Sequence, residues 1–302
     1  MAKITENVPL AGKTTYQIGG PARFYAEPER EGEIIELYQY AAERGLAVFV
    51  LGNGSNLLVS DGGIDGLVIN LSAKFVAINW GDGKTVSVLS GFLLDDLAAA
   101  AAERGLAGIE ELSGIPGTVG GAVIMNAGAF DTEIARTLRS VRVLRVAGLT
   151  IENLPAPSLG LGYRTSVLKG SGDVILSAVF EFEPAADAGR PLSVREQILR
   201  KRNEKQPLNY PNCGSVFKRP AGNYAGTLIE SCSLKNFKIG GAAISEKHAN
   251  FIINTGNATA EDVRGVIRHA QEAVYEKSGF LLEPEVIFAG DFTKPLYTPE
   301  KS

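Results

Sequence analysis

Two glycine-dense stretches constrain this chain more than any other feature. They cover residues 51–63 and 113–128, and strand-like apolar residues flank both. Glycine readily adopts the left-handed backbone region, so such a stretch can turn its N–H groups toward an anion. Neither stretch contains Lys or Arg. The pattern therefore predicts that neutral backbone groups hold a diphosphate, and two stretches favour a large dinucleotide over a mononucleotide.

The form of these stretches narrows the choice of cofactor. Neither has the G-x-x-x-x-G-K-[ST] pattern of a nucleotide-triphosphate loop or the G-x-G-x-x-G pattern of a Rossmann turn. This argues against a kinase and against tightly bound NAD. Flavin adenine dinucleotide (FAD) fits better. Taken singly, either stretch could also be an ordinary glycine-rich loop without a ligand.

Composition excludes several classes of partner. The chain has 302 residues, 45% of them hydrophobic, and 30 basic against 34 acidic residues give a formal charge of −4. No polybasic run is present, so we expect no nucleic-acid or membrane partner. The apolar runs are too short for a membrane span, and the N-terminus lacks a signal-peptide pattern, which predicts a cytoplasmic protein. Cys213 and Cys232 lack metal-ligand spacing and are expected to be free, and no metal site is expected.

Periodicity predicts mixed helices and strands in the first half of the chain. Ile34, Leu37, Tyr38 and Ala41 share one face of a helix over 31–45. The run 46–51 is predicted to be a fully buried strand. Further strands are expected over 66–71 and 84–90, and a helix over 95–104, whose consecutive alanines would allow close packing.

The second half follows the same pattern. Strands are predicted over 140–146 and 174–182, a linker over 184–191 and a charged helix over 193–205. The clearest helix spans 259–278. Thr259 and Asp262 form its capping box, and Gly279 is its C-terminal cap. A strand over 285–289 closes the fold, whose class is α/β or α+β, and a domain boundary is expected near 184–195.

Short polar segments outside the glycine stretches make the chain identifiable. Together with parts of those stretches they form a series of motifs at Thr15, 18–22, 54–58, 113–117, 162–166, 212–220, 240–245 and 282–286. In order, these motifs resemble those of the flavin-dependent UDP-N-acetylenolpyruvoylglucosamine reductases of bacterial peptidoglycan synthesis. The resemblance runs from about residue 7 to 290, and the Tyr-Arg-Thr-Ser and Cys-Gly-Ser segments suit the shorter branch, which lacks a tyrosine-bearing insertion.

The resemblance implies a fold and an arrangement of domains. The fold would be α+β, with a two-part FAD-binding region of the vanillyl-alcohol-oxidase type and a C-terminal substrate-binding domain. We expect FAD-binding subdomains over 1–72 and 73–190 and the substrate domain over 191–302, with the last strand able to pack back on the FAD region. FAD would be noncovalent and NADPH a transient reductant.

The resemblance also implies the reaction and its catalytic residues. The family reduces the enolpyruvyl ether of UDP-N-acetylglucosamine to the lactyl ether of UDP-N-acetylmuramate. Arg164 would hold the carboxylate and its developing enolate, because a guanidinium binds two oxygens at once. Ser215 would donate the proton. Glu285 would stabilise the enolic intermediate if its environment raised its pKa. The three groups would have to converge over one face of the flavin.

Binding residues are predicted in two sets. The substrate set is Lys205, Tyr210, Arg219 and His248. Its basic residues are expected to supply positive charge around the loop that carries Ser215. The cofactor set is Gly52, Asn53, Gly54, Ser55, Asn56, Leu57, Ser113, Gly114, Pro116, Gly117, Gly120, Gly121, Asn126 and Gly128.

Other interpretations stay open at this point. Without the other motifs, Arg164 could be a surface ion-pair partner and Ser215 a turn residue after Gly214. Glu285 could likewise be a carboxylate exposed to solvent. Two other functions are possible on the same scaffold. One is a different FAD-dependent oxidase or dehydrogenase, and the other is a flavin-binding module without turnover.

Overall fold

The computed structural model describes residues 1–293 and 295–299, which divide into two compact units. Unit 1 comprises residues 1–5, 25–53 and 66–201, and unit 2 comprises 6–24, 54–65 and the described residues from 202 onward. The boundary therefore falls inside the elements β1 (Ile4–Pro9), β2 (Pro21–Ala26), β5 (Ile64–Asn70) and α4 (Arg190–Lys205).

The two units divide the chain differently from the three predicted regions. The expected first subdomain, 1–72, contributes to both units, and the last boundary falls between Lys201 and Arg202 rather than near 184–195. The predicted linker is also shorter than expected, because α4 already begins at Arg190. The assignment of 1–72, 73–190 and 191–302 to cofactor and substrate stays a prediction.

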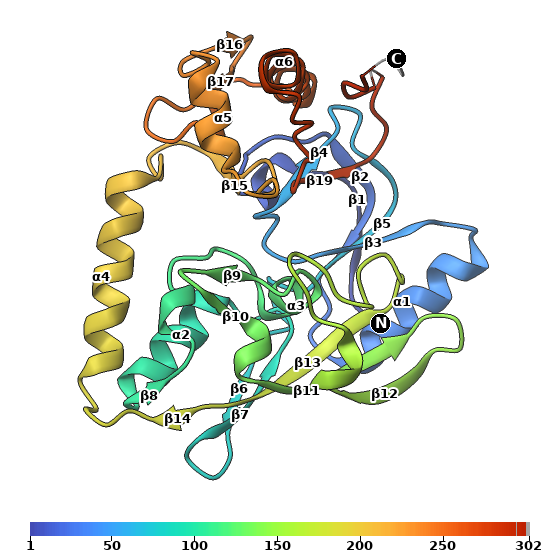
Figure 1. Cartoon of the computed structure of the whole chain (residues 1–302). Helices are drawn as coiled ribbons and strands as arrows, with labels where there is room; N and C mark the ends of the chain where they lie inside the picture. The colour runs from blue at the N-terminus through green and yellow to red at the C-terminus, as the bar shows by residue number, and fades with distance from the viewer. Residues whose placement is uncertain (294, 300–302) are drawn as a thin grey trace. The chain divides into compact units, whose positions relative to one another are not determined.

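Unit 1 is built on a five-stranded antiparallel sheet in the order β12-β11-β13-β7-β6 (Figure 1). The helix α3 packs on this sheet, and Ala98, Ala101 and Ala102 of α2 are buried. The elements are α1 (Glu31–Glu43), β3 (Val48–Leu51), β6 (Ile78–Trp80), β7 (Thr85–Leu89), α2 (Leu94–Glu103), β8 (Leu106–Ala107), α3 (Val119–Ile124), β9 (Gly128–Ala129), β10 (Thr132–Glu133), β11 (Leu138–Arg145), β12 (Thr150–Pro155), β13 (Val174–Glu181) and β14 (Glu183–Pro184).

Unit 2 has its own four-stranded sheet in the order β15-β18-β17-β16, covered by α6 (Figure 1). One buried cluster of this unit contains Tyr16, Phe217 and the apolar stripe of α6. The core of unit 1 is a separate cluster, formed by buried hydrophobic residues between Val86 and Phe182. The elements are β4 (Leu57–Val59), β15 (Asn212–Ser215), α5 (Ala225–Ser231), β16 (Lys238–Ile239), β17 (Ala242–Ile244), β18 (Phe251–Asn254), α6 (Ala260–Ser278) and β19 (Ile287–Ala289).

The ends of α6 follow the sequence prediction. The Thr259 hydroxyl accepts the Asp262 N–H at 3.0 Å, and the Asp262 carboxylate accepts the Thr259 N–H at 3.0 Å. Gly279 ends the helix with φ +74°. These contacts satisfy N–H groups at the first turn that have no partner within the helix.

The burial predicted for one strand was wrong. The 46–51 run was expected to be fully buried, but β3 exposes part of Val48, Phe49 and Val50, and only Leu51 is buried. The reason is its place at the edge of its sheet, where it pairs in parallel with β5 alone. Apolar composition does not distinguish an edge strand from a central one.

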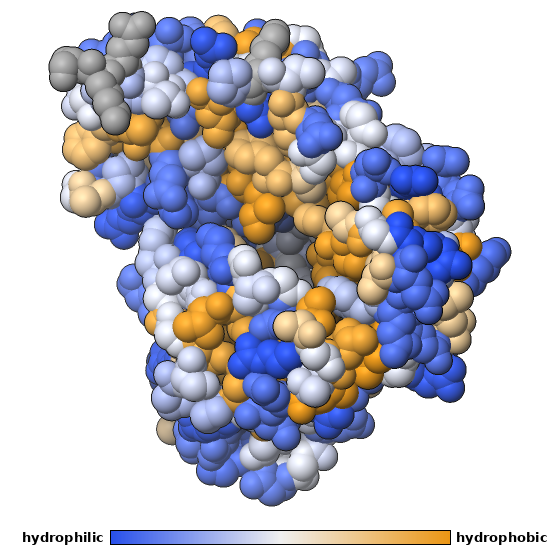
Figure 2. Space-filling view, turned by 90° about the vertical axis from the view of Figure 1, so that its right-hand side faces the viewer, coloured by the Kyte–Doolittle hydropathy of each residue, from blue (hydrophilic) through white to orange (hydrophobic). Residues whose placement is uncertain are grey.

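The surface mixes polar and apolar residues. Figure 2 shows hydrophobic patches among hydrophilic residues on one face. Within residues 1–293 and 295–299, no helix combines the length and apolarity that a membrane crossing requires.

Candidate active site

The second glycine stretch lies in unit 1 and contacts the start of the first. Asn53 Nδ2 donates to the Pro116 carbonyl at 2.7 Å. A Cβ at Gly52 would lie 2.6 Å from Thr118 Oγ1, so only glycine allows this approach. Thr118 in turn accepts the Gly121 N–H and caps α3, a helix that the sequence analysis did not predict. The capping Thr118 was the available signal for it.

Several predicted cofactor residues of this stretch hold the loop itself. The Ser113 hydroxyl donates to the Glu110 carbonyl at 2.6 Å, and the Gly114 N–H donates to Asp95 at 2.8 Å. The Gly120 N–H donates to the Ser90 carbonyl. These contacts give Ser113, Gly114 and Gly120 a structural explanation, and direct cofactor contacts from them stay a prediction.

The first glycine stretch continues in unit 2 with an open row of donors. Gly54 has φ +60°, and in the described part of the chain the N–H groups of Gly54, Ser55 and Asn56 donate to no other protein group. Successive free N–H groups beside a left-handed residue form a concave anion site. This row suits a diphosphate, so the residues present fit FAD. Leu57, the last residue predicted in this stretch, is buried in β4.

Thr15 links this row of donors to the strand that carries Ser215. Its hydroxyl donates to the Asn212 carbonyl at 2.7 Å, and its N–H donates to the Gly54 carbonyl at 3.3 Å. Asn212 begins β15, and Ser215 ends it opposite Phe251 of β18. Within unit 2, the proposed diphosphate cradle and the candidate proton donor are therefore joined through one residue.

Glu285 lies beside the same strand. Its N–H donates to the carbonyl of Val216, the residue after Ser215, at 2.7 Å, and its own carbonyl accepts from Asn56 Nδ2 at 3.1 Å. The strand β19 begins two residues later, at Ile287, and pairs in parallel with β4. Ser215, Glu285 and the cradle residue Asn56 are thus neighbours in unit 2, although about 230 residues separate Asn56 from Glu285 along the chain.

Ser215 has a hydroxyl that the fold does not use. The side chain is half-buried, and its Oγ makes no hydrogen bond with any residue of 1–293 or 295–299. The backbone two residues further along is held firmly, because the Asn250 amide donates to the Phe217 carbonyl at 2.9 Å and accepts the Phe217 N–H at 3.0 Å. Sequence analysis missed Asn250, for which a polar residue directly before a buried strand was the only signal.

Arg164 lies in unit 1 on a tight turn. The Gly162 and Thr165 backbones exchange hydrogen bonds at 3.1 and 3.2 Å, and Arg164 between them has φ +55°. Its guanidinium donates to the Gly128 carbonyl at 3.0 Å and lies 5.1 Å from the Tyr163 ring centroid. An arginine held in the left-handed region costs about 1 kcal/mol or more, and such residues cluster at functional sites.

The predicted substrate residues occupy several places in unit 2. Lys205 is exposed at the end of α4, and Tyr210 is exposed on the loop before β15. The Arg219 guanidinium stacks 4.1 Å from the Tyr224 ring centroid. Burial lowers the pKa of His248, which stacks edge-on against Phe251 and accepts the Asn250 N–H at Nδ1. His248 therefore supports the loop that holds Asn250, and its contact with substrate stays a prediction.

Cys213 is a thiol that the fold makes unreactive. Burial raises its pKa to about 12, a hydrogen bond with Tyr16 acts in the opposite direction, and the nearby Glu285 raises it further. We expect a thiol reagent at pH 8 to modify Cys232, which is partly exposed, and to leave Cys213 unmodified in the folded protein. Counting reactive thiols before and after adding denaturant measures this, with Cys232→Ala as the control. Modification of Cys213 in the folded control variant would contradict the prediction.

The cradle allows a second test. A Cβ at Gly54 would lie 2.7 Å from the Lys13 carbonyl oxygen, and φ +60° adds strain. We expect Gly54→Ala to weaken FAD binding at least about tenfold, which corresponds to about 1.4 kcal/mol. Fluorescence titration of the apoprotein with FAD measures this. Gly62→Ala is the matched control, because Gly62 has open space around it. Equal affinity in both variants would argue against a cradle at Gly54.

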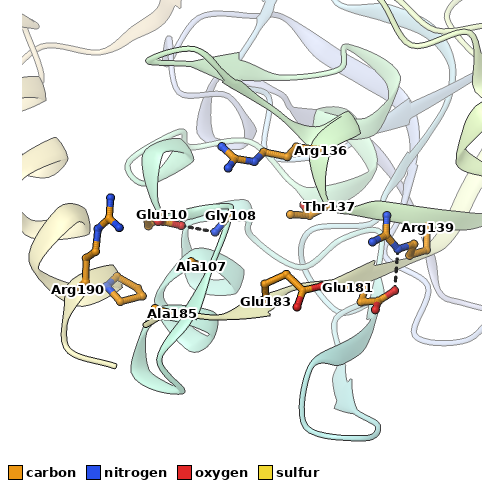
Figure 3. Close-up of a pocket in the computed structure, with 11 residues that line it drawn as sticks. Ala107, Gly108, Glu110, Arg136, Thr137, Arg139, Glu181, Glu183, Ala185 and Arg190 are labelled. Atoms are coloured by element: carbon orange, nitrogen blue, oxygen red, sulfur yellow. Dashed lines mark hydrogen bonds and ion pairs between the residues drawn. The ribbon is translucent and has the colours of Figure 1, made fainter. Parts of the chain in front are cut away.

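A cavity of about 250 Å³ lies elsewhere in unit 1 (Figure 3). None of the predicted site residues lines it. Its charged residues are mixed in sign and largely paired or exposed, so the cavity selects no class of ligand. They are Arg136, Arg139, Arg190, Glu110, Glu181 and Glu183. Within the described residues, no group of three or more His, Cys, Asp or Glu side chains could hold a metal ion.

Comparisons with known proteins find matches to the N-terminal and the C-terminal parts of this chain. A family model described as an FAD binding domain matches residues 22–152, and a model for the C-terminal domain of UDP-N-acetylenolpyruvoylglucosamine reductase matches 206–289. Reductases of that name from Caldicellulosiruptor bescii and Clostridium perfringens are 47% and 44% identical, with 96% and 95% of this chain and 92% and 93% of theirs covered.

A solved structure gives the same result at the level of the fold. The UDP-N-acetylenolpyruvylglucosamine reductase of Thermus caldophilus superimposes with a TM-score of 0.81 at 34% identity, and the match covers 96% of this chain and 99% of that one. The α+β class, the FAD-binding region and the C-terminal domain predicted from the sequence are confirmed.

Proposed function

Because this chain belongs to the family of UDP-N-acetylenolpyruvoylglucosamine reductases, we propose that it reduces UDP-N-acetylglucosamine enolpyruvate to UDP-N-acetylmuramate in peptidoglycan synthesis. It is an FAD oxidoreductase, and its substrates are small molecules, with NADPH as the reductant. The observation that carries the proposal is identity of 47% over nearly the whole length of both chains. A cytoplasmic location without nucleic-acid or membrane partners is part of the proposal, supported by the charge of −4.

The residues that would hold FAD come from both glycine stretches. The free N–H groups of Gly54, Ser55 and Asn56 are proposed to bind its diphosphate, and the remaining predicted residues of 52–57 and 113–128 to line its path. Asn126 would do so through its backbone, because its side chain is already hydrogen-bonded to Glu133, Ala135 and Gly162. Neutral donors suit this task because several backbone N–H groups that point to one place favour the negative charge of a diphosphate without a cationic side chain. When bound, FAD supplies the hydride that adds to the vinyl carbon of the substrate.

The chain itself supplies charge and a proton. Arg164 is proposed to bind the substrate carboxylate through its guanidinium and to stabilise negative charge that develops there. The Ser215 hydroxyl is proposed to donate its proton to the carbon next to that carboxylate. Glu285, whose backbone bonds to the residue after Ser215, is proposed to hydrogen-bond the enolic intermediate. Lys205, Tyr210, Arg219 and His248 are the proposed substrate contacts.

A spectrum of the purified protein tests the function. We expect the yellow flavin absorbance to bleach when NADPH is added under anaerobic conditions, and to return when UDP-N-acetylglucosamine enolpyruvate follows. Heat should release the flavin, because neither glycine stretch contains a His or Cys for a covalent link. Bleaching without recovery on adding the UDP-sugar would mean that the substrate is a different one.

A further inference from the structure

Two segments of unit 1 are linked at three points around the turn that carries Arg164. Asn126 Nδ2 donates to the Gly162 carbonyl at 3.1 Å. The Arg164 guanidinium donates to the Gly128 carbonyl at 3.0 Å, and Ser166 Oγ donates to the Ile124 carbonyl at 2.8 Å. Each end of the 162–166 segment is therefore tied to the 124–128 segment that follows α3.

Asn126 has the central place in this arrangement. It is completely buried and has φ +40°, a conformation that asparagine adopts more easily than most residues. Its Nδ2 also donates to Glu133 Oε2 at 2.9 Å, and its Oδ1 accepts the Ala135 N–H at 3.0 Å. One amide thus satisfies two acceptors and one donor, which neither an aspartate nor a leucine of similar shape can do.

The turn needs such support. Arg164 occupies the left-handed region, and the backbones of Gly162 and Thr165 close the turn around it with two hydrogen bonds. A strained residue persists only where its surroundings determine its conformation. A buried amide that binds the Gly162 carbonyl fixes the first residue of the turn and therefore the direction of the Arg164 side chain.

We propose that Asn126 is a positioning residue, which holds the 162–165 turn so that the Arg164 guanidinium faces the carboxylate of the substrate. This goes beyond the sequence prediction, in which Asn126 was a cofactor contact. The proposal rests on the proposed function for the identity of that carboxylate. The positioning itself depends only on the contacts within unit 1.

A pair of substitutions isolates the contact with Gly162. Asn126→Asp places a carboxylate beside Glu133, and adding Glu133→Gln lets the new glutamine donate to the aspartate. The Ala135 N–H keeps an acceptor, so only the Gly162 carbonyl loses its donor. At pH 8 the donors of Ala135 and of the substituted residue 133 favour the ionised aspartate, and we expect the double variant to fold and to bind FAD like the wild type.

Two measurements test the positioning. The Thr165 amide, which donates to Gly162, should exchange with solvent at least about tenfold faster in N126D/E133Q, since an untied turn opens more often. The flavin should be reoxidised by the UDP-sugar at least about tenfold more slowly, and this loss should disappear in an Arg164→Met background, because residues that act through one another are not additive. Reduction by NADPH should keep its wild-type rate.

Asn70→Asp is the matched control, because Asn70 is another buried asparagine of unit 1, with Nδ2 donating to the Tyr25 hydroxyl at 2.8 Å. It should leave the exchange of Thr165 unchanged. Equal exchange in N126D/E133Q and the wild type, or a loss of activity that adds fully to that of Arg164→Met, would overturn the proposal. If the wild type itself does not use the UDP-sugar, the proposed function fails, whereas the exchange measurement still decides the positioning.

Discussion

Substitution of Ser215 by alanine is expected to slow reoxidation of the reduced flavin by the enolpyruvyl UDP-sugar by about 10²–10⁴-fold, the range that a positioned proton donor contributes. The hydroxyl is half-buried and makes no hydrogen bond with any of the described residues. Its loss therefore leaves no protein group unsatisfied. The β15–β18 pairing and the Asn250 contacts act through the backbone and persist in the variant.

Stopped-flow absorbance of the flavin measures both half-reactions. Reduction by NADPH should proceed at the wild-type rate in Ser215→Ala, and its free energy of unfolding should change by less than about 0.5 kcal/mol. Ser215→Cys is the control, since a thiol keeps a proton at this position and should restore part of the rate. A wild-type rate of reoxidation in Ser215→Ala would show that the proton comes from another group.

Arg164→Lys is expected to lower kcat/KM for the UDP-sugar by about 10²–10³-fold, as loss of one charge-stabilising group does elsewhere. Lysine keeps the charge but not the planar pair of donors, so it binds one carboxylate oxygen where arginine binds two. The turn has room for the exchange because the side chain is only partly buried. The melting temperature should stay close to that of the wild type.

The matched control is Arg136→Lys. Arg136 is an exposed arginine of the same unit, outside both linked segments, and its replacement should leave kcat/KM unchanged. Steady-state kinetics with varied UDP-sugar and saturating NADPH separate the two variants. A kcat/KM within twofold of wild type in Arg164→Lys would remove Arg164 from the proposed mechanism.

Local signals in the sequence predicted much of the fold. The capping box at Thr259 and Asp262 and the glycine at 279 marked the ends of α6 because capping depends on residues within four positions of one another. Burial was predicted less well. The apolar run of β3 looked like a central strand, and its place at a sheet edge is set by residues far away in the chain.

The candidate site shows the same division. Motifs in order identified the family and named Arg164, Ser215 and Glu285, although their roles stay proposals. Asn126 was predicted as a cofactor contact, and that contact stays a prediction, but the hydrogen bonds of its side chain to Glu133, Ala135 and Gly162 were not foreseen. Asn250 gave almost no signal, because its partner Phe217 lies 33 residues away.

The sequence by itself determined the chemistry available to this protein: neutral glycine-rich loops for a dinucleotide, a guanidinium, a hydroxyl and a carboxyl, and the family whose motifs contain them. Only the tertiary structure decided which of these groups are hydrogen-bonded to other parts of the protein and which are available to a ligand. Among the described residues, the N–H groups of 54–56 and the Ser215 hydroxyl make no hydrogen bond, whereas both polar atoms of the Asn126 side chain are hydrogen-bonded. The physical reason is that a side chain's partners are chosen by contacts between distant segments, which no local pattern of residues records.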